Sequence, residues 1–136
     1  MLKEGQEFKI VMAVFPDNII PLVDFIEDIE LKDHDSAVAV IAHLKKVKNP
    51  HLHGPPLTKA LQGRLKGIYE IRCLSPLGKI RIMFVFEPGQ RIVVMNGVLK
   101  KSKQFAASDE KQIIKYKKIL DAKEATYEEF DFTIFE

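Results

Sequence analysis

The chain has 136 residues, of which 46% are hydrophobic and 29% charged, and a formal net charge of +2. This size and composition predict one compact globular domain and exclude a disordered chain. The apolar runs are shorter than the ~18–20 residues of a membrane span, and the start of the chain lacks the pattern of a signal peptide, so we expect a cytoplasmic protein that does not associate with membranes. The single cysteine, Cys73, excludes an internal disulfide and agrees with that compartment.

The first half of the chain predicts one strand and two helices. Residues 8–15 form a β-branched and aromatic run that is typical of a strand buried on both faces. Amphipathic spacing then indicates a helix with Pro21 in its first turn and a second helix that begins near Asp33 or Asp35. A loop with three prolines and one glycine follows over residues 49–57, because proline cannot donate the backbone hydrogen bonds of a helix or sheet.

The second half predicts three strands and a last helix. The strands cover residues 66–74, 79–86 and 91–99, and the two Pro/Gly turns between them favour an antiparallel meander. A helix follows over residues 108–122. We therefore expect an α+β fold with a four-stranded, antiparallel-dominated sheet, two N-terminal helices and a C-terminal helix, all three helices covering one face of the sheet.

The expected domain covers residues 1–123, and residues 124–136 form an acidic, aromatic C-terminal extension. This extension is interpreted as a short strand, as a mobile tail, or as a segment that lies across a basic face of the sheet in place of RNA.

Charge is distributed unevenly along the chain. Residues 1–42 carry a net charge of −6, residues 43–103 carry 13 Lys/Arg and 2 Asp/Glu for a net +11, and residues 104–136 carry −3. A basic segment in strand-forming sequence favours contact with a polyanion such as nucleic acid, because Lys and Arg release counterions from phosphates. The alternative is a solvated protein surface without a partner.

Two arginines fall at facing positions of the expected meander. If both turns close symmetrically, Arg72 lies opposite Arg81 and Arg81 opposite Asn96, unless a bulge or a three-residue loop shifts the register. Like charges directly opposite destabilise a sheet by roughly 0.2–1 kcal/mol, which favours an anion between them, and a phosphate suits the planar arginine fork. The alternative is that a carboxylate such as Glu70 or Glu87 pairs with each arginine.

Three segments in this order resemble the phage-derived, HigB-like branch of the RelE toxin superfamily: LQG and IYEIR at 61–72, KIRI at 79–82 and GVLKKSK at 97–103. The resemblance covers residues 55–122. It implies a RelE-like fold and the toxin component of a type II toxin–antitoxin system, a ribosome-dependent mRNA endoribonuclease or mRNA interferase. It further implies that no metal or cofactor is used, and that the partners are mRNA on the ribosome and a cognate helix-turn-helix antitoxin, with a homodimer left open.

The resemblance also implies the site. The expected catalytic residues are Arg72, Arg81, Lys101 and Lys103, and the expected RNA-binding residues are Lys66, Lys79, Asn96 and Lys100. The two arginines would stabilise the charge that develops on the phosphate in the transition state, and Lys101 or Lys103 would hold the substrate or assist proton transfer to the leaving oxygen.

The sequence departs from the family pattern at two points. Glu70 stands where some RelE-type enzymes have a lysine, and no C-terminal tyrosine or histidine is evident, which leaves Tyr116 and Tyr127 as candidates for that role. His51 and His53 have no Cys or carboxylate cluster nearby and are interpreted as loop histidines rather than metal ligands. The alternative function is a non-catalytic, phage-derived module of the same fold that binds RNA or a partner protein.

Overall fold

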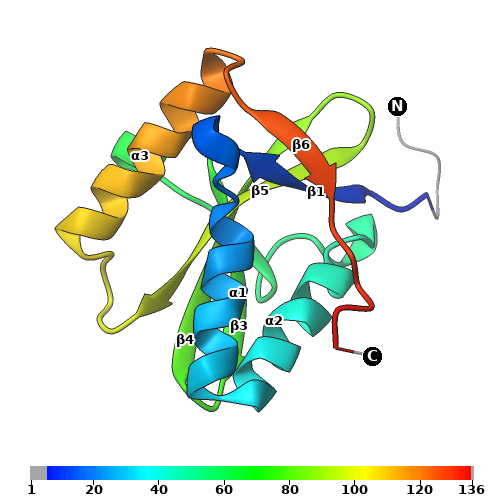
Figure 1. Ribbon diagram of the computed structural model, residues 1–136, viewed down its shortest axis with the longest axis vertical. Coiled ribbons are helices and arrows are strands. Elements are labelled where there is room, and N and C mark those ends of the chain that lie inside the picture. Colours follow the sequence, from blue (N-terminus) through cyan, green and yellow to red (C-terminus); the bar gives the residue numbers. More distant parts are fainter. Residues whose placement is uncertain (1–5, 136) are drawn as a thin grey trace.

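The computed structural model describes residues 6–135. The elements follow one another as β1 (Lys9–Val14), η1 (Pro16–Asn18), α1 (Pro21–Lys32), α2 (His34–Lys46), η2 (Pro50–Leu52), β2 (Thr58–Ala60), η3 (Gly63–Leu65), β3 (Tyr69–Ser75), β4 (Gly78–Glu87), β5 (Arg91–Lys100), α3 (Ala107–Asp121) and β6 (Thr126–Glu129). The α helices and most of the strands are labelled in Figure 1.

The strands form one six-stranded mixed sheet in the order β2-β3-β4-β5-β1-β6. β1 is parallel to β5, and every other neighbouring pair is antiparallel. The expected α+β class and the three α helices are present, but the prediction of a four-stranded, antiparallel-dominated sheet is wrong. The two strands that the sequence pattern did not resolve are short and lie at the edges: β2 after the proline-rich loop, and β6 within the C-terminal extension.

The helices cover both faces of the sheet, so the prediction that they share one face is also wrong (Figure 1). One buried cluster joins α1 and α2 to alternate residues of the strands, including Ile71 and Ile82. A second cluster joins Ile113 and Leu120 of α3 to the intervening residues, such as Met83. This arrangement follows from strand geometry, because successive side chains point to opposite faces and both sets are apolar.

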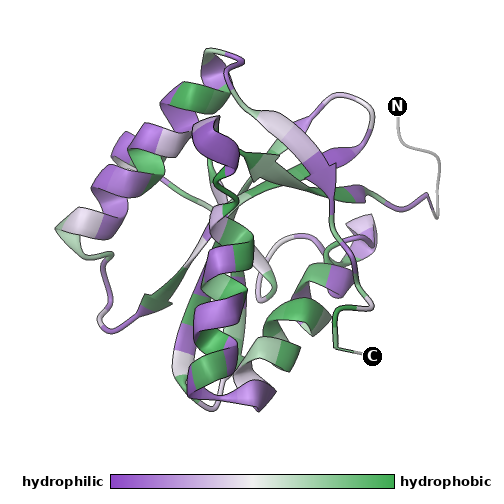
Figure 2. Ribbon diagram, viewed as in Figure 1, coloured by the Kyte–Doolittle hydropathy of each residue, from purple (hydrophilic) through white to green (hydrophobic). Residues whose placement is uncertain are grey.

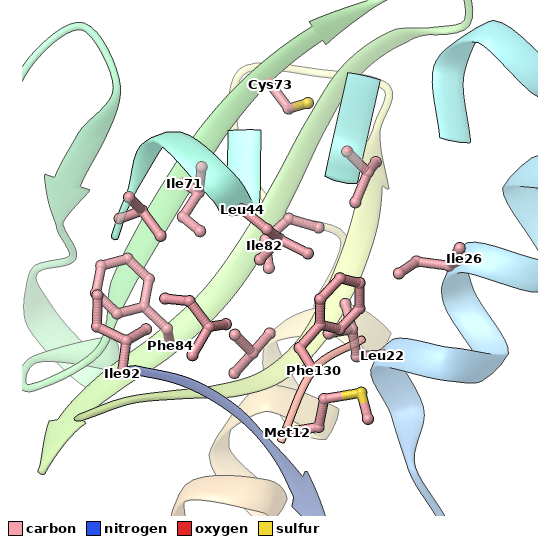
Figure 3. Close-up of a cluster of buried hydrophobic side chains, with 14 of the residues drawn as sticks. Met12, Leu22, Ile26, Leu44, Ile71, Cys73, Ile82, Phe84, Ile92 and Phe130 are labelled. Atoms are coloured by element: carbon pink, nitrogen blue, oxygen red, sulfur yellow. The ribbon is translucent and has the colours of Figure 1, made fainter. Parts of the chain in front are cut away.

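The apolar stripes of the helices account for this packing. In Figure 2, α1 and α2 alternate hydrophobic and hydrophilic surface around their axes, as amphipathic helices do. Figure 3 shows Leu22 and Ile26 of α1 and Leu44 of α2 in one cluster with Ile82 and Phe84 of β4. These side chains are at most 2% exposed, so this cluster is a closed core.

Two contacts fix the helices on their strands. The Asp33 carboxylate caps α2 by accepting hydrogen bonds from Ser36 N at 2.9 Å and Ser36 Oγ at 2.6 Å. Ser36 Oγ in turn accepts from Leu77 N in the β3–β4 turn at 3.2 Å, which joins that turn to the start of α2. On β5, Gly97 lies under Phe25 of α1, and a Cβ at this glycine would be 2.3 Å from the ring.

The C-terminal extension forms part of the sheet and then runs beside α2. β6 pairs antiparallel with β1, and the next residue, Phe130, is buried in the core cluster. Beyond it, Lys48 lies 5.0 Å from the Phe132 ring, and the rings of His34 and Phe135 are 5.2 Å apart. No hydrogen bond or ion pair joins residues 126–135 to the facing arginines of β3 and β4. The extension is therefore a short strand at the edge of the sheet and does not occupy the arginines in place of RNA.

Candidate functional site

The first hairpin has the predicted register. Arg72 of β3 lies directly opposite Arg81 of β4, and the turn closes between Ser75 and Gly78. The alternation of β3 and β4 turns both arginines away from Ile71, which belongs to the α1 and α2 cluster. The arginines therefore project from the face of the sheet that α3 partly covers.

The second hairpin departs from the predicted register. Arg81 faces Val98, and Asn96 lies opposite Met83. Two features account for the shift. A three-residue loop joins β4 to β5, with Gly89 and Gln90 at positive φ, and one extra residue of β5 forms a bulge opposite the Met83/Phe84 step. Asn96 is buried, and its Oδ1 has no hydrogen-bond partner within residues 6–135.

A single buried carboxylate lies between the facing arginines. Glu70 Oε2 is 3.3 Å from Arg72 Nε and 3.4 Å from Arg81 Nε, and the Glu70 side chain is only 3% exposed. The Arg81 side chain is 5% exposed, and its Nη1 donates to the Ile80 carbonyl at 3.0 Å, whereas the Arg72 side chain is 40% exposed. The alternative prediction, that a carboxylate pairs with the arginines, is therefore confirmed: both arginines share the single carboxylate of Glu70.

Two lysines complete a group of cations around this carboxylate. Lys79 lies directly opposite Lys100 at the end of the β4–β5 pair. Partial burial lowers the pKa of Lys100; Glu70 opposes this effect, and the charges of Arg81, Arg72 and Lys79 add to it. We call Arg72, Lys79, Arg81 and Lys100 with Glu70 the basic cluster. Its formal charge is +3, so Glu70 neutralises only part of it.

Burial also acts on Arg81 itself. The pKa of Arg81 is lowered mainly by desolvation, and the neighbouring Glu70 carboxylate works in the opposite direction. A guanidinium remains protonated at neutral pH in spite of such shifts, because its ordinary pKa exceeds 12. The basic cluster thus holds a permanently charged guanidinium with little exposure to solvent, and an anion would compensate this charge better than the hydration that 5% exposure allows.

A cavity of about 590 Å³ opens at the edge of β3 beside the basic cluster. Its lining combines leucine and proline side chains with cations, and comes from α2, the loop after it, β3 and β4. The residues are His43, Lys46, Leu52, Pro56, Leu57, Arg72, Leu74, Lys79 and Arg81. β2 pairs with β3 only as far as Ile71, and Arg72 N donates to the Leu57 carbonyl at 2.7 Å, so within residues 6–135 this edge of β3 has no paired strand from Cys73 onward.

The structure brings together only part of the site expected from sequence. Arg72, Arg81 and Lys79 line the cavity, and Lys100 lies opposite Lys79. The other three lysines of that prediction do not line the cavity, are exposed in loops, and have no ion pair within residues 6–135: Lys66, Lys101 and Lys103.

Neither tyrosine considered for proton transfer lies at the basic cluster. The Tyr116 ring packs against Phe15, with centroids 4.4 Å apart. Tyr127 lies on the edge strand β6, and burial together with a hydrogen bond to Glu87 raises its pKa to about 12. Glu87 is at the β4–β5 loop, the opposite end of the hairpin from Lys79 and Lys100.

Sequence reasoning gave no role to two residues that line the cavity. His43 and Lys46 are one turn apart on α2, so the helical period puts them on the same side. Their spacing was visible in the sequence, but nothing in it connected that side of α2 with the edge of β3. Within residues 6–135 no group of three or more His, Cys, Asp or Glu side chains is placed to hold a metal ion, and no helix is long and apolar enough to cross a membrane.

Comparison with known proteins shows the family to which the chain belongs. No curated protein matches the chain. The family model described as phage-derived protein Gp49-like (DUF891) matches residues 24–118, which include most of α1, all of α2, the whole β2–β5 part of the sheet and most of α3. The match covers well over half of the chain and every residue of the basic cluster. The protein therefore belongs to the phage-derived Gp49-like family, a RelE/HigB-like family of toxin–antitoxin systems.

Proposed function

We propose that this protein is the toxin of a type II toxin–antitoxin system and that it cleaves mRNA in a ribosome-dependent manner. The observation that carries the proposal is the basic cluster, in which two facing arginines share one buried carboxylate, with two facing lysines nearby, beside an open cavity. The proposed partners are mRNA on the ribosome and a cognate helix-turn-helix antitoxin.

The proposed reaction uses the RNA itself as nucleophile. The ribose 2′-hydroxyl attacks the adjacent phosphorus, the bond from phosphorus to the 5′ oxygen breaks, and the products are a 2′,3′-cyclic phosphate and a 5′-hydroxyl end. The proton of the 2′-hydroxyl passes to solvent water as the new bond forms, and the departing 5′ oxygen takes a proton from Lys101 or Lys103, which solvent then reprotonates. Because the pentavalent phosphorane carries more negative charge than the substrate, cations fixed in place stabilise it more than the ground state.

In this proposal the two arginines have distinct roles. Glu70 contacts the Nε side of both guanidinium groups, and an arginine offers five N–H donors in all. The terminal nitrogens of Arg72 have no hydrogen-bond partner within residues 6–135, and this side chain is partly exposed, so it contacts the phosphate directly. Arg81 is buried and supplies a fixed positive charge beneath it. Lys79 and Lys100 bind the neighbouring phosphates, and Lys101 or Lys103 in the adjoining loop contacts the leaving oxygen.

Induced expression in a bacterial host tests the proposal. Wild-type protein should arrest growth and generate new mRNA 5′ ends in register with codons, and Arg72→Ala and Arg81→Ala should abolish both effects. Arg91→Ala is the matched control, because Arg91 is 37% exposed and pairs with Glu87 at 3.3 Å, much as Arg72 pairs with Glu70. Growth arrest that persists in both cluster variants, or that disappears equally in Arg91→Ala, would contradict the assignment.

Two observations favour a second candidate, a non-catalytic module that binds RNA or a partner protein. The carboxylate already compensates part of the arginine charge, and Tyr116 and Tyr127 both lie away from the cluster. A binding module would leave growth and transcripts intact on expression, yet retain RNA in a filter-binding assay. The nuclease proposal requires mRNA cleavage that is lost when residues of the basic cluster are replaced.

A further inference from the structure

We infer that the cavity at the edge of β3 is a nucleobase pocket that holds the base next to the scissile phosphate, and that His43 makes this pocket select against uracil. The inference rests on the proposed function, because it assigns to the same site the nucleotide whose phosphate meets Arg72 and Arg81. It adds a base-recognition role for α2, which sequence reasoning did not provide.

The chemistry of the cavity matches a nucleotide in two respects. Its volume of about 590 Å³ falls within the roughly 300–1,000 Å³ of small-molecule pockets. Leu52, Pro56 and Leu57 form an apolar wall, and Arg72, Lys79 and Arg81 add positive charge. An aromatic base with an attached phosphate has the same division, since its faces are apolar and its phosphate is anionic. A free phosphate would leave the apolar wall without a contact, and an apolar peptide would leave the cations unpaired.

His43 gives the pocket a defined hydrogen-bonding atom. Its Nδ1 lies 2.7 Å from the Ala39 carbonyl, and a carbonyl accepts only, so Nδ1 carries the proton. In the neutral ring Nε2 is then an acceptor, and it has no protein partner within residues 6–135. Because His43 lines the cavity, this lone pair is available to a ligand.

The bases differ in what they offer to such an acceptor. Adenine, cytosine and guanine each carry an exocyclic amino group that donates, and uracil carries carbonyl acceptors in its place. A pocket with an acceptor at His43 therefore favours the three amino bases. With uracil, both exocyclic positions present carbonyl oxygens to the Nε2 lone pair, and the only base donor, the ring N3–H, lies between these two carbonyls, so uracil pairs less favourably with this acceptor. Lys46, one turn further along α2, is a donor that any base can use and carries little discrimination.

Binding of mononucleotides to the purified full-length protein tests the inference. Calorimetric titrations would use 3′-AMP, 3′-UMP and inorganic phosphate at one salt concentration. We expect 3′-AMP to bind at least about tenfold more tightly than phosphate and about three- to tenfold more tightly than 3′-UMP. His43→Ala should remove the preference for 3′-AMP over 3′-UMP, and His51→Ala, an exposed loop histidine, should keep it. Equal affinities for phosphate and both nucleotides would overturn the inference, as would an unchanged preference in His43→Ala.

A second variant probes the apolar wall. Leu52 is 45% exposed, so Leu52→Asp should fold, and it should weaken 3′-AMP binding about tenfold while leaving phosphate binding nearly unchanged. Leu31→Asp, at a leucine that is 87% exposed on α1, is the control and should bind both as wild type does. If the protein binds both nucleotides equally but still cuts mRNA, the inference about the pocket is refuted and the proposed nuclease activity is not. Base-selective binding by a protein that leaves growth and transcripts intact would support the pocket and refute the nuclease.

Discussion

Replacing the buried carboxylate of the basic cluster should affect stability and RNA binding in opposite directions. Glu70→Gln removes the negative charge between Arg72 and Arg81 with little change in volume. Removing one partner of a buried ion pair costs about 3–5 kcal/mol, because the other charge stays buried and unpaired. Arg81 is 5% exposed and would remain a buried charge without a partner, whereas Arg72 is 40% exposed and can be hydrated. We therefore expect a loss at the low end, about 3 kcal/mol.

Such a loss is easily measured in a chain of this size. At about 3–5 °C per kcal/mol, Glu70→Gln should lower Tm by roughly 10 °C, which circular dichroism during heating or urea titration will detect. Glu87→Gln is the matched control, because it breaks a partly exposed pair with Arg91 and should cost less than about 1 kcal/mol. The cluster charge rises from +3 to +4 in Glu70→Gln, so RNA affinity at low salt should increase.

The double variant Glu70→Gln/Arg81→Met tests whether the unpaired charge of Arg81 causes the loss of stability. If it is, removal of the guanidinium should restore most of the lost stability, because an apolar side chain of similar length suits a buried position. A loss below 1 kcal/mol in Glu70→Gln, or a double variant no more stable than the single one, would refute the reasoning.

Three further predictions concern other parts of the fold. Gly97→Ala should destabilise the protein by about 1–3 kcal/mol in urea unfolding, since its Cβ would meet the Phe25 ring, and adding Phe25→Ala should make the Gly97→Ala change nearly neutral. Burial raises the pKa of Cys73 to about 11, so iodoacetamide at about pH 8 should label it only after unfolding; rapid labelling of the native protein would contradict its burial. The hydrogen bond that His34 Nδ1 donates to the Glu30 carboxylate raises the pKa of His34 above 6.5. Its contribution to the free energy of unfolding is therefore present below pH 6.5 and lost as pH rises through the raised value; His34→Ala should remove that dependence, and an unchanged pH profile would refute it.

Local patterns predicted the helices and the central strands well. The apolar spacing of α1 and α2, and the Pro/Gly turn before Gly78, are signals within a few residues of each other, and the structure has these elements close to where they were expected. The facing of Arg72 and Arg81 followed because a two-residue turn fixes the register of a hairpin. Alternation along β3 likewise puts Tyr69 and Arg72 on opposite faces, and Tyr69 packs against the α1 and α2 cluster.

Features that depend on distant contacts could not be predicted from local pattern. The pairing of β1 with β5 joins residues about 80 positions apart, and β6 is a strand only because β1 offers it an edge. The bulge near Asn96 moved that residue away from Arg81, since one extra residue shifts every pair beyond it. The same limit applies to α3, because an amphipathic pattern specifies an apolar side and not the face of the sheet that receives it.

The candidate site shows the same division. Arg72, Arg81 and Lys79 were found because they lie on adjacent strands whose register could be worked out. His43 lines the same cavity from α2, a placement that only the packing of this helix along β3 produces. Glu70 was identified as a potential partner of the arginines, but the sharing of one carboxylate by both follows from their common face and their burial, which the structure shows.

The central claim is that the basic cluster cleaves mRNA, and the most direct test is the end chemistry of RNA cut on the ribosome. Purified protein would be added to ribosomes programmed with a defined mRNA, and the fragments analysed for a 2′,3′-cyclic phosphate and a 5′-hydroxyl. The account predicts both ends with wild-type protein, a rate at least about a hundredfold lower in Arg81→Ala, and an unchanged rate in Arg91→Ala. Intact mRNA with wild-type protein, or equal rates in wild type and Arg81→Ala, would contradict it.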